Sequence, residues 1–379
     1  METIAIGDAC DILNGYAFKS EKYVSTGIRI IRIANVQKGY IEDNSPVFYP
    51  SNSIGLDKYM LRENDLLLSL TGNVGRTALL RKEMLPAALN QRVACLRLKT
   101  NLLTDRYLFH LLNSDYFESK CIQSSKGVAQ KNLSTEWLKS YRIPLYSISK
   151  QEEITKVLDQ VRKIIDSHKE QLQKYDELIK SRFVEIFGEL SSNPYGWETF
   201  TMGECFDITS SKRILKSEWR AQGIPFLRVR DIVQLATTGQ MENEYFVSEE
   251  FYKSLSDYDG VPQRGDILVS ATSTLGKCHV VGEEERYYFK DADVLRFRAK
   301  KKINPIFFVE LMKEHYIEEQ ISKTLGITTV AHFTIKAAKN INMRCPDIEL
   351  QNEFANFVAQ VDKSKLTLCR YNVMEYKCE

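Results

Sequence analysis

Residues 147–188 read SISKQEEITKVLDQVRKIIDSHKEQLQKYDELIKSRFVEIFG, and this stretch decides the fold of the chain. Ser149 and Glu152 stand three residues apart, as in a capping box, and Gly188 is suited to end a helix because glycine accepts a positive φ. The stretch therefore predicts one long helix over 149–188. Apolar residues recur along it at the three- and four-residue spacing of a coiled-coil seam, at Ile154, Leu158, Val161, Ile165, Leu172, Tyr175, Ile179 and Ile186.

A helix with a one-sided apolar stripe needs a partner, and residues 347–379 provide one. At a separation of 200 residues, Gln351 repeats Gln151 and the similarity continues along both helices. The chain is therefore an internal repeat of one unit, a domain followed by a long helix. The repeat extends upstream, where GIRIIRI (27–33) matches GIPFLRV (223–229) and NDLLLSLTGNVGR (64–76) matches GDILVSATSTLGK (265–277).

The repeat predicts an α+β fold with two globular domains. The predicted boundaries are 1–148 for the first domain, 149–190 for the central helix, 191–346 for the second domain and 347–379 for the C-terminal helix. A compact helix is expected over 104–118, and its copy is expected to start at Asn304 with Pro305 at its first position. Short runs rich in Val, Ile and Leu predict strands near 28–33, 66–70, 93–98, 224–229, 267–271 and 294–298.

The composition excludes several classes of protein. Of the 379 residues, 43% are hydrophobic, which is enough for two cores. We expect no signal peptide and no membrane span, and the eight cysteines stand singly, which favours a reducing cytoplasm over a zinc or disulfide framework. The net charge is only +2, but residues 1–150 hold 20 Lys and Arg against 14 Asp and Glu. The basic surplus therefore lies in the first domain.

Two sequence patterns resemble catalytic motifs but fail on inspection. The run 193–195 (NPY) lacks the second proline of the N-P-P-Y loop of adenine methyltransferases, and no glycine-rich cofactor loop precedes it. Pro346-Asp347 and the EYK run at 375–377 match a loose nuclease pattern, but one helix of ~40 Å separates them. The five histidines show no ligand spacing. The sequence predicts no catalytic residue, no metal ligand and no cofactor bound directly by the chain.

Matched loops in the two halves suit contact with a polyanion. A turn after the second strand ends in a cation in both copies, at Arg76 and at Lys277, and its Gly, Ser, Thr and Asn content allows backbone and hydroxyl contacts to phosphate. The segment after the first strand carries Arg, Asn and Gln, the side chains that read base edges. We predict DNA contacts at Asn14, Tyr16, Lys19, Arg32, Asn35, Gln37, Thr71, Asn73, Arg76, Gln130 and Lys131, and at Lys212, Arg213, Arg228, Arg230, Asp231, Thr272, Thr274, Lys277, Thr328 and His332.

Several segments in this order resemble the specificity subunits of type I restriction-modification systems. They include the NGYAFKS and GIRIIRIANV openings, the DLLLSLTGNVGR turn, NQRVACLRL, QKNL (130–133), and FVEIFGELSSNPYGWE between the halves. The resemblance covers nearly the whole chain. It implies two globular α/β target-recognition domains joined by two long antiparallel coiled-coil helices with pseudo-twofold symmetry.

The same resemblance implies a function. Each domain would read one half of a split site in double-stranded DNA, and the helices would dock two methyltransferase subunits. Those subunits would bind S-adenosylmethionine and methylate adenine, and restriction-translocase subunits that use ATP and Mg can join them. The specificity subunit itself would not be an enzyme. Two alternatives are a stand-alone nuclease or methyltransferase with an unrecognised active site, and a tandem-domain adaptor that binds only proteins.

Overall fold

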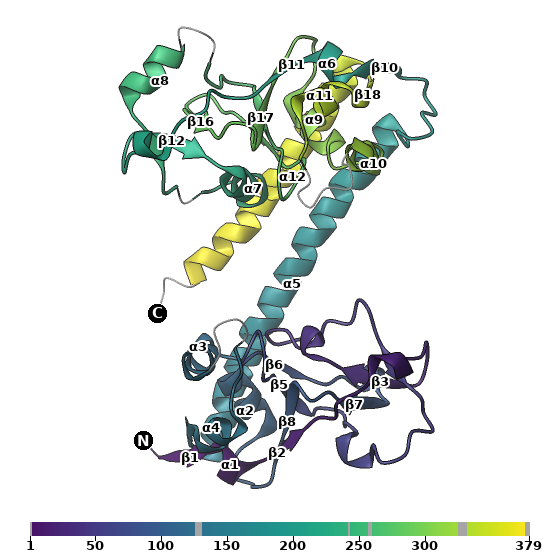
Figure 1. Cartoon of the computed structure of the whole chain (residues 1–379), viewed down its shortest axis with the longest axis vertical. Helices are drawn as coiled ribbons and strands as arrows, with labels where there is room; N and C mark the ends of the chain where they lie inside the picture. The colour runs from purple at the N-terminus through teal and green to yellow at the C-terminus, as the bar shows by residue number, and fades with distance from the viewer. Residues whose placement is uncertain (1, 126–130, 242, 257–259, 325–331, 376–379) are drawn as a thin grey trace. The chain divides into compact units, whose positions relative to one another are not determined.

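The computed structural model describes residues 2–125, 131–241, 243–256, 260–324 and 332–375, and it divides into two compact units (Figure 1). Unit 1 ends at Ser167 and unit 2 begins at His168. Among the described residues, no helix has the length and apolar character needed to cross a membrane.

Unit 1 contains a four-stranded antiparallel sheet and a three-stranded sheet. The order of the first is β2 (Cys10–Asn14), β8 (Val93–Leu98), β5 (Leu66–Ser69) and β6 (Thr77–Leu79). In the second, β3 (Ile28–Ile31) lies between β4 (Phe48–Tyr49) and the parallel β7 (Ala87–Leu89). The remaining elements are β1 (Thr3–Ala5), which pairs with β9 (Arg142–Pro144), and the helices α1 (Ile6–Ala9), α2 (Asp105–Leu112), α3 (Asp115–Ser124) and α4 (Thr135–Ser140).

Unit 2 repeats this topology strand for strand, which confirms the internal repeat. Its four-stranded sheet has the order β11 (Phe206–Thr209), β17 (Val294–Ala299), β14 (Ile267–Ser270) and β15 (Cys278–Val280), and its three-stranded sheet the order β13 (Phe246–Val247), β12 (Ile224–Leu227) and β16 (Tyr288–Phe289). β10 (Glu198–Thr201) pairs with β18 (Asn342–Cys345). The helices are α6 (Met202–Cys205), α7 (Val229–Thr238), α8 (Glu249–Ser256), α9 (Pro305–Leu311), α10 (His315–Thr324) and α11 (Ile335–Lys339).

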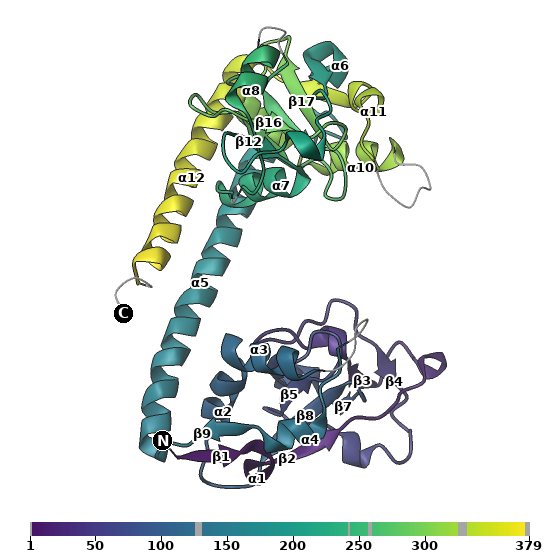
Figure 2. The same ribbon diagram turned by 60° about the vertical axis from the view of Figure 1, so that its left-hand side comes forward.

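One of the two central strands of each four-stranded sheet, β5 or β14, is a continuous apolar run buried on both faces. The strand β5 has α2 and α3 on one side and β3 and β7 on the other (Figure 2). Leu66 and Leu68 pack with α2 and α3, whereas Leu67 packs with Ile31 and Leu89 of the three-stranded sheet. A continuous apolar run, rather than an alternating one, is what such a strand requires. The run at 267–269 does the same in unit 2. All six predicted strands are found.

The predicted helix over 104–118 is wrong, because the chain breaks there. α2 ends at Leu112, and the side chain of Ser114 accepts a hydrogen bond from the N–H of Phe117 (3.2 Å) to begin α3. In unit 2, Asn304 caps α9 with Pro305 at its start, as predicted.

The long helix α5 spans Ile148–Phe187. The residue that caps its first turn is Ser147, whose hydroxyl accepts a hydrogen bond from the N–H of Lys150 (3.4 Å). The predicted cap at Ser149 is therefore wrong, because the observed cap lies two residues earlier. Gly188 follows the helix with φ +73°, as predicted. A side chain there would lie 2.5 Å from the ring of Pro194, so glycine is needed for packing as well as for φ.

A buried glutamine ties the start of each long helix to its domain. Gln151 is fully buried, donates to the carbonyls of Leu102 (2.7 Å) and Tyr146 (2.9 Å), and accepts from the N–H of Thr104 (2.9 Å). Gln351, at the start of α12 (Ile348–Glu375), makes the corresponding bonds. It donates to the carbonyl of Pro346 (2.7 Å) and accepts from the N–H of Asn304 (2.9 Å).

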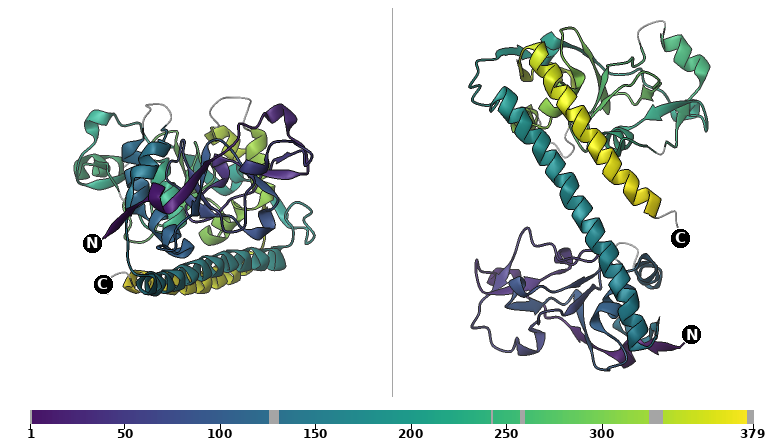
Figure 3. Two further views of the ribbon diagram at one scale, coloured as in Figure 1. Left: turned by 90° about the horizontal axis from the view of Figure 1, so that it is seen from below. Right: turned by 180° about the vertical axis from the view of Figure 1, so that it is seen from behind.

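Within unit 2, the second half of α5 packs antiparallel to α12 (Figure 3). The rings of Phe187 and Phe354 lie 5.5 Å apart, and Arg182 lies over Phe357. One more pair, Asp176 with Lys365 (2.6 Å), joins the helices further along. Of the predicted seam, Ile179 is buried, but Leu158 and Val161 are 40% and 41% exposed. The sequence pattern missed Phe183 and Phe187, which are buried.

We expect Phe183→Ala to destabilise unit 2 by about 3–5 kcal/mol, because its ring contacts Phe187, Phe307 and Phe354. Leu178→Ala on the same helix is the control. That side chain is 46% exposed, so its loss should cost less than ~0.5 kcal/mol. Urea unfolding of the full chain measures both, and equal losses would contradict the core position of Phe183.

Candidate nucleic-acid interface

The turns after β5 and β14 have the same hydrogen-bonded structure. In unit 1, the buried Ser69 donates its hydroxyl to the carbonyl of Asn73 and accepts from the N–H of Arg76 (3.0 Å). These two hydrogen bonds fix the backbone of the turn, including that of Arg76, the cation at its end. In unit 2, the corresponding residues are Ser270, Thr274 and Lys277, and the last bond is 2.9 Å.

A second segment joins each turn through an isolated β-bridge. Thr71 is bridged to Asn132, and Thr272 is bridged to His332. Thr71 is buried and Thr272 is half-buried, whereas His332 is exposed. The sequence placed these segments in one candidate interface, and the structure brings them together in both units.

Part of this second segment cannot be described in either unit. Gln130 and Thr328 lie outside the described residues. Lys131 is described, and its carbonyl accepts from the N–H of Gly72 (2.8 Å) while its side chain is exposed. The contact of Lys131 with the turn is therefore made by its backbone, which leaves its ammonium group at the surface.

The two glycines of the first turn, Gly72 and Gly75, are required for different structural reasons. Gly72 has φ +69° and lies open to solvent, and its counterpart Ser273 takes φ +59°. Gly75 instead faces α3, where an added Cβ would lie 2.7 Å from Cβ of Cys121. Gly72 therefore lies at an open position, although its N–H is already bonded to Lys131, whereas Gly75 is required by packing against α3.

The cation of the first turn is held by polar neighbours. The guanidinium of Arg76 donates to Oε1 of Gln37 and lies 3.9 Å from a carboxylate oxygen of Glu118. Lys38 pairs with the same carboxylate (2.9 Å) and with Asp115. Burial opposes the charge of Lys38, but the hydrogen bonds to both acids raise its pKa. Gln37 and Arg76 were predicted separately, and the structure joins them.

Asn35 and Asp231 have the same local role in the two units. Oδ1 of Asn35 accepts from the N–H of Arg32 (2.9 Å), and Oδ2 of Asp231 accepts from the N–H of Arg228 (2.8 Å). Both side chains are buried, at 5% and 0% exposed. They cap the segment after the first strand and hold its backbone. Nη2 of Arg32 donates to the carbonyl of Ser45 (3.0 Å).

Arg228 and Arg230 converge on Glu244, an acid that the sequence reasoning missed. Nη2 of Arg230 lies 2.7 Å from Oε2 of Glu244, and that of Arg228 lies 3.5 Å from the same oxygen. The guanidinium of Arg228 stacks 4.3 Å above the ring of Tyr245. The hydrogen bond from Arg230 lowers the pKa of Glu244. Repeat matching gave no signal for Glu244, because the two units differ in this segment.

The remaining predicted residues lie at the surface. Asn14 ends β2, and Tyr16 is 38% exposed with its ring against Phe18 and Tyr59. The exposed cations Lys19, Lys131, Lys212, Arg213 and Lys277 form no ion pair with any residue that the structure describes.

The regions that resemble catalytic motifs are structural. Asn193 closes a turn on Trp197 by accepting from its N–H (2.9 Å) and donating to its carbonyl (3.0 Å). Asp347 directly precedes α12 and Glu375 is its last residue, so the whole helix separates them, and 376–377 lie outside the described residues. Within the described ranges, no group of three or more His, Cys, Asp or Glu is placed to hold a metal ion.

Residues 1–175 and 194–372 each match the family described as the type I restriction modification DNA specificity domain. The chain therefore belongs to this family, as the sequence resemblance indicated.

Individual relatives have the same character. The chain is similar to the EcoAI specificity subunit of Escherichia coli, with 33% identity over 165 residues, or 42% of this chain and 28% of that protein. It is also similar to the EcoBI specificity subunit of Escherichia coli, with 24% identity over 94% of this chain and 78% of that protein. The S subunit of a type I system from M. genitalium has the same fold (TM-score 0.55, 15% identity, 98% of this chain and 91% of that one).

We expect Ser270→Ala to destabilise unit 2 by about 1–3 kcal/mol, because it leaves the carbonyl of Thr274 and the N–H of Lys277 without their partner. Thr274→Ala removes only an exposed side chain from the same turn and should have little effect. Chemical denaturation compares the two. An equal loss of stability would show that the serine does not hold the turn.

Proposed function

We propose that this chain is the DNA-specificity subunit of a type I restriction-modification complex, and that each unit recognises one half of a bipartite site in double-stranded DNA. The duplicated turn held by Ser69 and Ser270 supports this most directly. One framework used twice suits a DNA site in two parts. Because the backbone is shared and the side chains differ, each unit would meet a different half-site.

The candidate residues divide into phosphate contacts and base contacts. The fixed cations Arg76 and Lys277, together with exposed lysines, suit phosphate, which positions the protein without reading sequence. Arg228 and Arg230 are candidates for reading base edges in unit 2, because a guanidinium can donate two parallel hydrogen bonds to guanine. Asn35 and Asp231 hold the backbone, so we assign them to support rather than to base contact.

The partners follow from the family. In this proposal, residues 1–148 and 191–346 are the recognition domains, and residues 149–190 and 347–379 are the spacer that docks two methyltransferase subunits. S-adenosylmethionine would bind to those subunits, and ATP and Mg to restriction subunits where these join. This chain contributes recognition and assembly and performs no chemistry itself.

Replacing Arg76 or Lys277 with Ala should weaken binding to every DNA sequence. Each change should reduce the slope of log affinity against log salt by about one, because one phosphate contact is lost. Fluorescence anisotropy over a range of salt concentrations, with cognate and unrelated duplexes, measures this. A variant that alters sequence preference at an unchanged slope would contradict the assignment to phosphate.

Exchanging residues 1–145 for those of a relative should change one half of the methylated motif and leave the other half intact. The reason is that unit 1 has its own core and its own contact loops. Sequencing methylated DNA from a host that also expresses the methyltransferase subunit gives the result. A motif changed in both halves, or in neither, would argue against independent recognition by the two units.

A further inference from the structure

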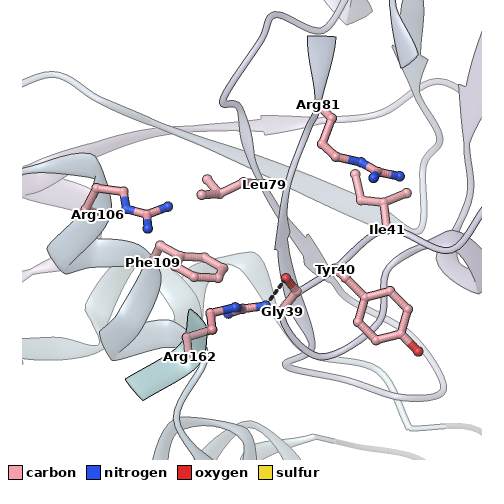
Figure 4. A pocket seen from close by; sticks show the side chains of 8 residues that line it. All are labelled: Gly39, Tyr40, Ile41, Leu79, Arg81, Arg106, Phe109 and Arg162. Atoms are coloured by element: carbon pink, nitrogen blue, oxygen red, sulfur yellow. Dashed lines mark hydrogen bonds between the residues drawn. The ribbon is translucent and has the colours of Figure 1, made fainter. Parts of the chain in front are cut away.

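A cavity of about 330 Å³ in unit 1 is lined by three arginines from three different elements (Figure 4). Arg106 belongs to α2, Arg162 to α5, and Arg81 follows β6. The ring of Phe109 and the side chain of Leu79 provide apolar walls. No carboxylate is among the lining residues, but two of the arginines are paired with acids outside the lining, Arg106 with Asp159 (2.5 Å) and Arg162 with Asp166 (3.9 Å). Arg81 is therefore the arginine of the lining whose charge is not balanced by a described acid.

Two of the arginines are fixed in place. Nη2 and Nε of Arg106 donate to the two carboxylate oxygens of Asp159, at 2.5 and 3.2 Å. Arg162 stacks 5.1 Å from the ring of Phe109 and donates to the carbonyl of Gly39 (2.5 Å). Their positions are therefore set before any ligand arrives, which lowers the cost of binding.

The backbone at Gly39 packs closely against the guanidinium group of Arg162. Gly39 has φ +84°, and a Cβ at this position would lie 2.5 Å from Nη2 of Arg162. Any other residue would displace that side chain from the cavity wall. The third arginine differs from the first two, because Arg81 is exposed and forms no hydrogen bond or ion pair with a described residue through its side chain.

The cluster is absent from the repeat. At a separation of 200 residues, Arg106 corresponds to Ile306 and Arg162 to Asp362. A role in folding the shared framework would be expected in both units. Arg106 and Arg162 are therefore not part of the framework that the two units share.

We propose that this cavity binds a phosphate group, and that its source is the backbone of the DNA recognised by unit 1. The guanidinium fork matches phosphate oxygens in pairs. Gln37, which bonds to Arg76, lies two residues before Gly39. Two residues of chain span at most about 7 Å, or roughly two phosphates of one strand along the helix axis. The cavity thus extends the proposed interface, and the inference rests on the proposed function.

Arg81→Gln in the full chain is the test, since it removes the unpaired charge and leaves the two fixed arginines in place. Affinity for all duplexes should fall about five- to tenfold, and the slope of log affinity against log salt should fall by about one. Arg62→Gln makes the same charge change at an exposed arginine of unit 1 outside the cavity, and Arg81→Lys keeps the charge. Both should leave the salt slope unchanged.

The remaining outcomes separate the possible failures. Wild-type chain without salt-dependent DNA binding would overturn the proposed function and this site with it. Salt-dependent wild-type binding with equal slopes for Arg81→Gln and Arg62→Gln would overturn the site alone. In a third outcome, inorganic phosphate stabilises the chain against heat, Arg81→Gln abolishes this effect, and the salt slope of DNA binding is unchanged. The ligand of the cavity would then be a free phosphorylated molecule and not DNA. If Arg81→Gln instead lost binding to the methyltransferase subunit at an unchanged salt slope for DNA, the ligand of the cavity would be an acidic protein surface and not DNA.

Discussion

The fold depends on a buried amide at the first turn of each long helix. Gln151 uses both donor and acceptor groups on the backbone around the start of α2 and the end of β9. A buried polar group is tolerated when its hydrogen bonds are made, and it is costly when one of them is lost. The three bonds come from fixed directions, so they set the angle at which the helix leaves the domain. Gln351 makes two of the corresponding bonds in unit 2, and the orientation of each helix to its own domain is thus specified by hydrogen bonds as well as by apolar packing.

The repeat preserves the framework and varies the segments placed on it. Asp65 pairs with Arg97 and Asp266 with Arg298, both at 2.6 Å, and both acids also accept from a backbone N–H three residues earlier. Beyond the first strand the units diverge, since unit 1 has a short turn at 33–35 where unit 2 has the ten-residue helix α7. A fixed core with variable contact segments is what two recognition units of different sequence preference require.

The sequence predicted the strands, the long helices and the repeat because each depends on local pattern. The details that it missed depend on three-dimensional neighbours. Ser147 and Ser149 are both suitable residues to cap a helix, and the position of β9 in the domain determines that the helix begins after Ser147. Asn35 looks like a base-reading residue by type, but its amide is used within its own loop. Repeat matching pairs Glu118 with Glu318 and gives no signal for Glu244, and in neither case does it show the arginine that the acid holds, because ion pairing is a property of the folded surface.

These acids bear on how a chain of net charge +2 discriminates among DNA sequences. The carboxylate of Glu244 weakens the attraction of Arg230 to any phosphate, because the guanidinium must break its pair with the carboxylate or bind both groups at once. Exposed pairs of this kind are weak and screened by salt, so a well-placed base edge can compete with them. Specificity is a difference between two affinities, and an acid that lowers both by the same amount leaves that difference intact. In the function proposed above, the acid would also hold the arginine in one orientation, so that a correct base would meet a donor pair that is already placed. On that proposal, low net charge and paired arginines go together, because affinity would be concentrated at a few positioned cations.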